Sequence, residues 1–186
     1  MRRSRSLAGL LATLLVGLLV GAGPAPSADG FYEALLEGRV LEVEQRLDAD
    51  PALVHARFPL GLTPLHVAVD SQRLDLVELL VDRGADVNAR SDSGRTPLHE
   101  AVLRSELPPL LCLVFAGADL GAVDQDGMTP LHWAAKLQKP KVVQALVNRG
   151  APLDLRDRQG RTPLDLARLM GPEESVRLLE QAARAR

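Results

Sequence analysis

A four-residue word, Thr-Pro-Leu-His, recurs along this sequence and constrains its fold more than any other feature. The word begins at Thr63, Thr96 and Thr129, and a fourth copy beginning at Thr162 ends in aspartate instead of histidine. Successive copies are 33 residues apart, and self-similarity at such a fixed period is the signature of a repeat array. We therefore expect a stack of similar units in which each unit buries its apolar face against its neighbours.

Each copy of the word has the chemistry of a helix start. A threonine hydroxyl can accept a hydrogen bond from an unpaired amide of the first turn, and proline at the first helical position loses nothing, because its amide would be unpaired there. The leucine of each word and the alanine three residues later are expected to face inward. A second helix is predicted in each unit, ending at a glycine that can close it in the left-handed conformation. The predicted second helices are residues 74–83, 109–116 and 141–149.

The same units carry a second signature, Gly-Ala-Asp, at Gly84-Ala85-Asp86 and Gly117-Ala118-Asp119. Together the two signatures resemble the ankyrin repeat. The resemblance implies an all-α repeat fold, an ankyrin solenoid of about five helix–turn–helix units with hairpin-like loops, and a role in binding other proteins. The expected units are an N-terminal capping repeat at 30–57, full repeats at 58–90, 91–123 and 124–156, and a C-terminal capping repeat at 157–186.

The N-terminal 23 residues have a composition of their own. Arg2, Arg3 and Arg5 precede an apolar run from Leu7 to Val20, and small residues follow. This layout is typical of a secretory signal peptide, and the run is shorter than the roughly 20 residues of a membrane-spanning helix. We expect a signal peptide at 1–23, a spacer at 24–29, and a periplasmic or secreted protein. The alternative is an uncleaved N-terminus that anchors the protein in the membrane.

Composition and motifs argue against several kinds of function. The formal net charge is −2, whereas nucleic-acid-binding proteins are normally basic on one face. No nucleophile–base pair, phosphate-cradling glycine loop or calcium-loop spacing occurs, so we expect neither an enzyme nor a cofactor. The repeated histidines, His66, His99 and His132, could suggest a metal. However, equivalent atoms of stacked helices lie about 8–10 Å apart, too far to share one zinc, and the resemblance gives these histidines a structural role.

The resemblance implies that a partner binds to the loop tips and to the exposed end of each first helix. Trp133 is a candidate anchor for a partner, because it stands where Val67, Glu100 and Leu166 stand in other units; simple packing is the alternative. The candidate partner-binding residues are Leu60, Leu62, Asp92, Ser93, Arg95, Arg104, Gln125, Asp126, Met128, Trp133, Lys136, Leu137, Arg158 and Arg161.

A second candidate surface lies on the second helix of the third unit. Leu111 and Phe115 share one helical face, at positions where other units carry polar residues. Exposed apolar pairs can mark a contact site; alternatively, Pro108-Pro109 retilts the helix and half buries both. Cys112, the one cysteine, aligns with Leu79 and Ala145 and is expected in the core, with a redox role as the alternative.

These observations predict a monomeric, non-enzymatic scaffold of the bacterial envelope or periplasm that binds a protein partner. Two other functions remain open. One is a specific inhibitor or immunity-type partner of an exported enzyme, and the other is a protective factor in oxidative stress. No nucleic-acid partner is expected, and no membrane contact is expected unless the N-terminal segment is uncleaved.

Overall fold

The computed structural model describes residues 26–171 and 173–185, which form ten α-helices and two 3₁₀ helices. The α-helices form five antiparallel pairs, as the sequence predicted, and no strand occurs in these residues. Two 3₁₀ helices, η1 (Pro51–His55) and η2 (Pro59–Gly61), follow the first pair. The five pairs are α2 (Pro26–Glu37) with α3 (Val40–Ala49), α4 (Pro64–Asp70) with α5 (Leu74–Asp82), α6 (Pro97–Arg104) with α7 (Leu107–Phe115), α8 (Pro130–Lys136) with α9 (Pro140–Asn148), and α10 (Pro163–Met170) with α11 (Glu173–Arg184).

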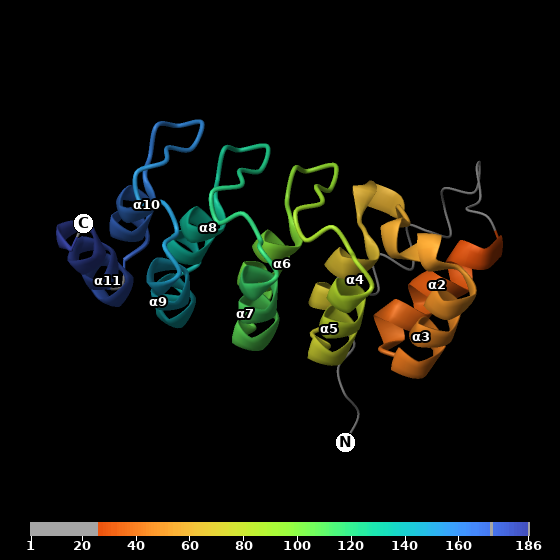
Figure 1. Ribbon diagram of the computed structural model, residues 1–186. Coiled ribbons are helices and arrows are strands. Elements are labelled where there is room, and N and C mark those ends of the chain that lie inside the picture. The colour runs from red at the N-terminus through yellow and green to blue at the C-terminus, as the bar shows by residue number, and fades with distance from the viewer. Residues whose placement is uncertain (1–25, 172, 186) are drawn as a thin grey trace, which may run out of the picture.

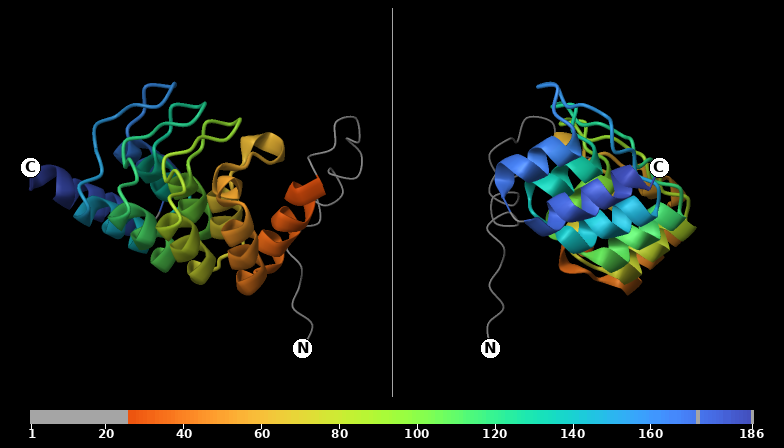
Figure 2. Two further views of the ribbon diagram at one scale, coloured as in Figure 1. Left: turned by 45° about the vertical axis from the view of Figure 1, so that its right-hand side comes forward. Right: turned by 90° about the vertical axis from the view of Figure 1, so that its left-hand side faces the viewer.

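The pairs stack side by side into a curved array of two helical layers (Figures 1 and 2). The first helices of the units form one layer, and the second helices form the other. The loops that connect successive units all project to the same side of the array (Figure 1). This arrangement leaves one face of first helices and loop tips, and an opposite outer face of second helices.

The first helices of the repeats begin where the recurring word predicted, at the proline of each copy. In the unit of α8, the Thr129 hydroxyl accepts a hydrogen bond of 3.2 Å from the His132 amide, which satisfies an otherwise unpaired donor of the first turn. In the last unit the Thr162 hydroxyl accepts from the Asp165 amide at 3.2 Å. The helix start is therefore kept even where the histidine is lost.

The core runs continuously through the stack along the inner sides of both layers. Its regular members are the leucine of each word and the alanine three residues later, because a small residue allows the two helices of a unit to approach closely. Six of these inward positions are fully buried: Leu65, Ala68, Leu98, Ala101, Leu131 and Ala134.

Backbone hydrogen bonds hold the connecting loops in register. The Gln125 amide donates to the Ser93 carbonyl at 3.0 Å, and the Arg158 amide donates to the Asp126 carbonyl at 2.9 Å. Gly127 has a φ of 74°, and a Cβ atom built there would come within 2.9 Å of the Arg158 backbone nitrogen. Glycine is therefore required at this position both by its backbone conformation and by the closeness of the next loop.

The sequence predicted a signal peptide at 1–23 and a spacer at 24–29. The predicted signal peptide and the first two residues of the predicted spacer lie outside the described residues. The rest of the predicted spacer is helical, because α2 begins at Pro26, where proline fits the first turn of a helix. Among the described helices, none is long and apolar enough to cross a membrane.

Candidate binding groove

The three repeated histidines each link one unit to the next. His66 Nε2 lies 3.1 Å from the Arg95 carbonyl oxygen, and its Nδ1 lies 2.8 Å from the Thr63 hydroxyl. A carbonyl can only accept, so Nε2 carries the proton and Nδ1 accepts from Thr63. His99 and His132 make the same inter-unit bond at 3.0 Å. The histidines therefore fix the loops that carry the candidate binding residues.

Burial keeps these rings neutral. It lowers the pKa of His66 and His99 to about 4, and it also lowers the pKa of His132. A neutral ring is the form that both accepts at Nδ1 and donates at Nε2. This is the structural role that the family resemblance implied for the three histidines.

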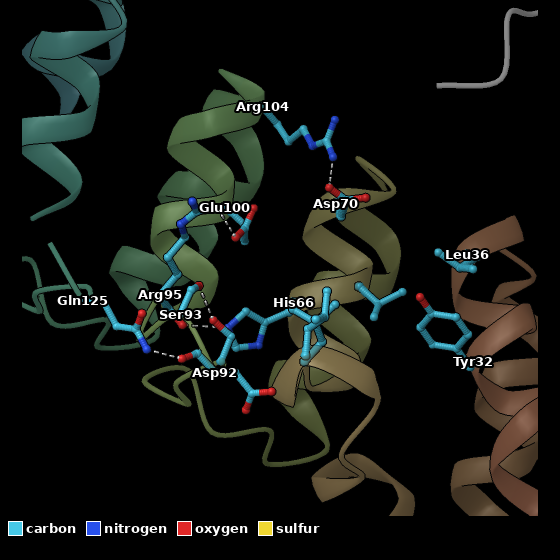
Figure 3. A pocket seen from close by; sticks show the side chains of 14 residues that line it. Tyr32, Leu36, His66, Asp70, Asp92, Ser93, Arg95, Glu100, Arg104 and Gln125 are labelled. Carbon is cyan, nitrogen blue, oxygen red and sulfur yellow. Dashed lines mark hydrogen bonds and ion pairs between the residues drawn. The ribbon is translucent and has the colours of Figure 1, made fainter. Parts of the chain in front are cut away.

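A groove of about 580 Å³ lies between the first helices of the first three units and the neighbouring loop tips (Figure 3). Tyr32 and Leu36 lie at one end of the groove (Figure 3), and Leu60, a residue that is 70% exposed, lines it next to Asp92, whose amide donates a hydrogen bond of 2.9 Å to the Leu60 carbonyl. The other end is polar. The lining residues are Tyr32, Leu36, Leu60, Leu62, His66, Val67, Asp70, Ser91, Asp92, Ser93, Arg95, Glu100, Arg104 and Gln125.

Ion pairs organise the polar wall of the groove. Asp70 on α4 pairs with Arg104 on α6, so this contact joins two neighbouring units (Figure 3). Arg95 lies 3.5 Å from Glu100. Burial raises the pKa of the Glu100 carboxyl, and the Arg95 guanidinium opposes that rise. Burial, with a smaller contribution from Asp70, raises the pKa of Tyr32, so its hydroxyl is a neutral donor and acceptor facing the groove.

Trp133 extends this surface toward the next unit. Its indole Nε1 donates to the Asp124 carboxylate at 2.7 Å, so the ring is held in one orientation. Arg95 lies 5.2 Å and Lys136 lies 4.6 Å from the ring centre, within the range of cation–π attraction. Trp133 is half-buried, so it has a packing role and also remains partly accessible to solvent.

The structure brings half of the predicted binding residues into one groove. The seven that line it are Leu60, Leu62, Asp92, Ser93, Arg95, Arg104 and Gln125. Trp133 and Lys136 lie next to it through Arg95. The remaining exposed candidates, Asp126, Leu137 and Arg158, do not line it.

Two predicted positions differ from expectation. Met128 was predicted as a loop-tip contact, and this prediction is wrong, because its side chain is only 2% exposed and belongs to the core. Its amide donates to Asp124 and its carbonyl accepts from His99, so its backbone is also engaged. Arg161 is half-buried, and its guanidinium forms hydrogen bonds of 2.9 and 2.7 Å with the buried Asp157 carboxylate.

Seven of the fourteen groove residues were not among the predicted candidates, namely Tyr32, Leu36, His66, Val67, Asp70, Ser91 and Glu100. Tyr32 and Leu36 come from α2, which belongs to a unit without the recurring word, so no sequence register placed them opposite the loops. Glu100 had a usable signal, because it stands where Val67, Trp133 and Leu166 occur in other units. A carboxylate at a position otherwise apolar indicates a special environment, here the wall of the groove.

In the second candidate surface, Phe115 fits the interpretation of an exposed contact residue, and Leu111 fits that of a half-buried one. Phe115 is 71% exposed, whereas Leu111 is half-buried. Cys112 is also half-buried rather than fully buried, as are Leu79 and Ala145 at the same position of other units. Cys112 packs against the core from its edge, so the expectation that it is a fully buried core residue is wrong.

Comparison with known proteins agrees with this architecture. A family model described as ankyrin repeats in three copies matches residues 104–185, and one described as ankyrin repeats in many copies matches residues 59–108. An ankyrin repeat protein of fowlpox virus (strain NVSL) is 44% identical over 55 residues. That match covers 30% of this chain and 13% of the viral protein, so the chain spans a small part of this relative.

The two family models, the five helix pairs and the histidine links identify the chain as a member of the ankyrin-repeat proteins. Ankyrin repeats generally mediate protein–protein interaction.

Proposed function

We propose that this protein is a non-enzymatic scaffold that binds a protein partner through the groove between its loop tips and first helices. The observation that carries this proposal is the exposure of Leu60 in a groove that is also lined by Tyr32, Leu36 and Leu62. The side chain is 70% exposed, and the backbone at Leu60 has a φ of 65°, which is uncommon for a residue other than glycine. Leu60 shares the groove with the apolar side chains of Leu36 and Leu62, and apolar side chains gathered in this way are typical of a contact surface.

The lining defines the chemistry that a partner needs. An apolar side chain of the partner fits against the Tyr32, Leu36 and Leu60 side chains that line the groove, where burial of apolar area supplies the binding energy. Beside Leu60, whose carbonyl oxygen accepts a hydrogen bond of 2.9 Å from the Asp92 amide, the exposed Asp92 carboxylate is available to accept hydrogen bonds from the partner's amides or cationic groups. The partner segment that suits this groove has an apolar anchor followed by polar or basic residues.

The proposed location is the bacterial envelope or periplasm. This part of the proposal rests on the basic start and apolar run of residues 1–23, which have the composition of a signal peptide. An uncleaved segment would instead tether the repeats to the membrane. N-terminal sequencing of the protein from the native compartment separates the two: loss of about the first 23 residues indicates a cleaved signal.

A second candidate function is that of a specific inhibitor or immunity-type partner of an exported enzyme. The Asp70–Arg104 ion pair favours it, because a groove braced across two units is ordered before binding and so costs less entropy to fill. An inhibitor forms a tight one-to-one complex that survives purification. A protective role in oxidative stress is the third candidate, and altered survival of a deletion strain in peroxide would separate it from the others.

Affinity capture after cross-linking in the native compartment tests the main proposal. The informative variant is Leu60→Glu, which replaces an exposed apolar side chain of the groove by a charged one. The matched control is Leu41→Glu, because Leu41 is 75% exposed and lies on α3 in the layer of second helices. We expect Leu60→Glu to lose the captured partner and Leu41→Glu to retain it. Equal capture by both variants would contradict the proposal.

A further inference from the structure

Helix α7 carries an apolar stripe on the outer face of the array, and none of its nine residues is charged. Pro108, Leu111, Cys112 and Phe115 lie at i, i+3, i+4 and i+7, and therefore on one side of the helix. With α5, which lies beside it (Figure 1), this stripe forms a shallow groove of about 480 Å³. The neighbouring helices α5 and α9 carry polar residues at the positions of Leu111 and Phe115, so α7 alone of the three has the stripe.

The α5 wall of this groove is acidic. Among the described residues that line the groove, Glu78 is the one with a charge, and Asp82, one turn further along α5, is exposed on the same side of that helix. After burial, the negative charges of these two carboxylates are the largest causes of the raised pKa of the Cys112 thiol, so both lie close to the stripe. Within the described residues, neither carboxylate forms an ion pair.

One step earlier in the stack, the acidic residues of a second helix are neutralised within the chain. Arg83 follows the end of α5, and its guanidinium nitrogens lie 2.7 Å from an Asp48 carboxylate oxygen and 3.3 Å from a Glu44 carboxylate oxygen on α3. The residue that follows α7 at the repeat position of Arg83 is Ala116. The carboxylates of α5 therefore receive no cation from α7 and remain available to a partner.

The walls of the groove determine the conformation of the partner. Both walls are helices, whose backbone amides and carbonyls are paired within each helix. An extended segment would therefore leave its own backbone groups without partners in an apolar groove, at a cost in free energy. A helix pairs those groups internally, and its side chains fit the valley between two packed helices.

We propose that the groove between α5 and α7 binds an amphipathic helix of a partner protein that carries lysine or arginine along one edge. Its apolar side chains cover Leu111 and Phe115, and its cations face Glu78 and Asp82. The two walls are nine residues long, so the contact spans about two and a half helical turns. This surface belongs to the layer of second helices (Figure 1), so it does not depend on the function proposed for the other groove.

Arg149 determines which side the basic edge of the partner takes. Its guanidinium lies 4.1 Å from the centre of the Phe115 ring, and it follows α9, on the side of α7 opposite to α5 (Figure 1). A cationic edge placed on that side would meet a like charge, whereas the same edge on the α5 side meets two carboxylates. The basic edge of the bound helix is therefore directed toward α5.

Two synthetic peptides test the charge of the partner. The first is a fluorescein-labelled helix of about 18 residues, long enough to be helical in water, with leucines in one stripe and lysines along one edge. The matched peptide has glutamate in place of each lysine. By fluorescence anisotropy with the whole protein, we expect the lysine peptide to bind at least about tenfold more tightly than the glutamate peptide. Equal binding of the two peptides, or no binding of the lysine peptide, would overturn the proposal.

Variants of the protein locate the surface. Phe115→Ser should weaken binding of the lysine peptide about tenfold without changing thermal unfolding, because the ring is exposed. Glu78→Gln combined with Asp82→Asn should reduce the preference for the lysine peptide. Glu33→Gln is the matched control, since Glu33 is exposed on α2 in the layer of first helices, and it should bind like the wild type.

Two outcomes would assign the surface differently. Binding of the lysine peptide that none of the groove variants changes would overturn the proposal, because the peptide would then bind elsewhere. Sedimentation velocity supplies the second check. A wild-type dimer that Phe115→Ser dissociates would also overturn it, because a second copy of the chain would then cover the stripe.

Discussion

His99 and Met128 are joined by a hydrogen bond of 3.0 Å that runs from the imidazole Nε2 of one repeat to a backbone carbonyl in the loop of the next. Both residues are buried, at 0% and 2% exposure. The bond fixes the loop that precedes α8 relative to α6. Because His66 and His132 make the same bond, the loop tips are ordered by the same histidines that cap the first helices.

Stability is predicted to fall in mild acid. The pKa of His66 and His99 is lowered from 6.5 to about 4 in the folded chain, chiefly by burial. The unfolded chain therefore binds protons first as the pH drops, so the stabilisation is complete above about pH 6.5 and is lost progressively toward pH 4. Each histidine should reduce the free energy of unfolding by roughly 1.4 kcal/mol per pH unit in this window. Urea unfolding followed by circular dichroism measures the slope.

The variant His99→Gln separates this effect from other acid-sensitive groups. Glutamine can still donate to the Met128 carbonyl but does not titrate. We expect a loss of about 1–2 kcal/mol at pH 7 and a shallower dependence between pH 6.5 and 4 than in the wild type. An unchanged slope would show that His99 does not contribute to the pH dependence.

Asp124 is predicted to be a structural carboxylate. It is buried, its Oδ1 accepts from the amides of Asp126 and Met128 at 2.9 Å, and its Oδ2 accepts from Trp133. Asp124→Ala leaves these donors unpaired and should cost about 1–3 kcal/mol. It should also shift the emission of the single tryptophan. The exposed Asp92 provides the control, since Asp92→Ala should change neither signal appreciably.

Lys139 is predicted to stabilise the end of α6 from the next unit. Its Nζ donates to the Val102 and Leu103 carbonyls at 3.0 and 2.6 Å, which belong to the last turn of that helix. Cations at a helix C-terminus also interact favourably with its dipole. Lys139→Met should lower the free energy of unfolding by about 1.5–3 kcal/mol. Lys136→Met removes only a cation–π contact with Trp133. It should therefore lower the free energy of unfolding by less, about 0.5–1 kcal/mol.

Cys112 is predicted to be a slow nucleophile. Burial, followed by the negative charges of Glu78 and Asp82, raises the pKa of its thiol. The thiolate is the reactive form, so alkylation by iodoacetamide at pH 8 should be slower in the folded chain than in urea. A faster reaction in the folded chain would contradict this prediction and would favour the alternative of a redox role for Cys112. Replacing both acidic residues by their amides should raise the folded rate.

The repeat frame could be predicted from the sequence because its chemistry is local. A threonine cap followed by proline specifies a helix start by itself, and all four first helices of the word-bearing units begin at that proline. The inward leucines and alanines follow from helical periodicity once the start is known. Fold class and helix pairing were therefore accessible without any long-range information.

Side-chain direction in the loops was not accessible in the same way. Met128 and Arg95 occupy the same repeat position, yet Met128 points into the core and Arg95 lines the groove. The choice depends on what the neighbouring unit offers, an apolar space in one case and Glu100 in the other. The contribution of Tyr32 and Leu36 was missed for a similar reason, because it depends on how α2 packs beside α4.

Site-specific photo-cross-linking tests most directly whether the groove binds a protein partner. A photoreactive amino acid is placed at Ser93 or Gln125 in the groove, or at Leu41 on α3 as the control, and cells are irradiated before lysis. We predict that both groove positions give one common adduct and that position 41 does not give it. The adduct should be lost when Leu60→Glu is introduced into the same chain. Adducts that form from position 41 but from neither groove position would contradict the claim that this groove is the binding surface.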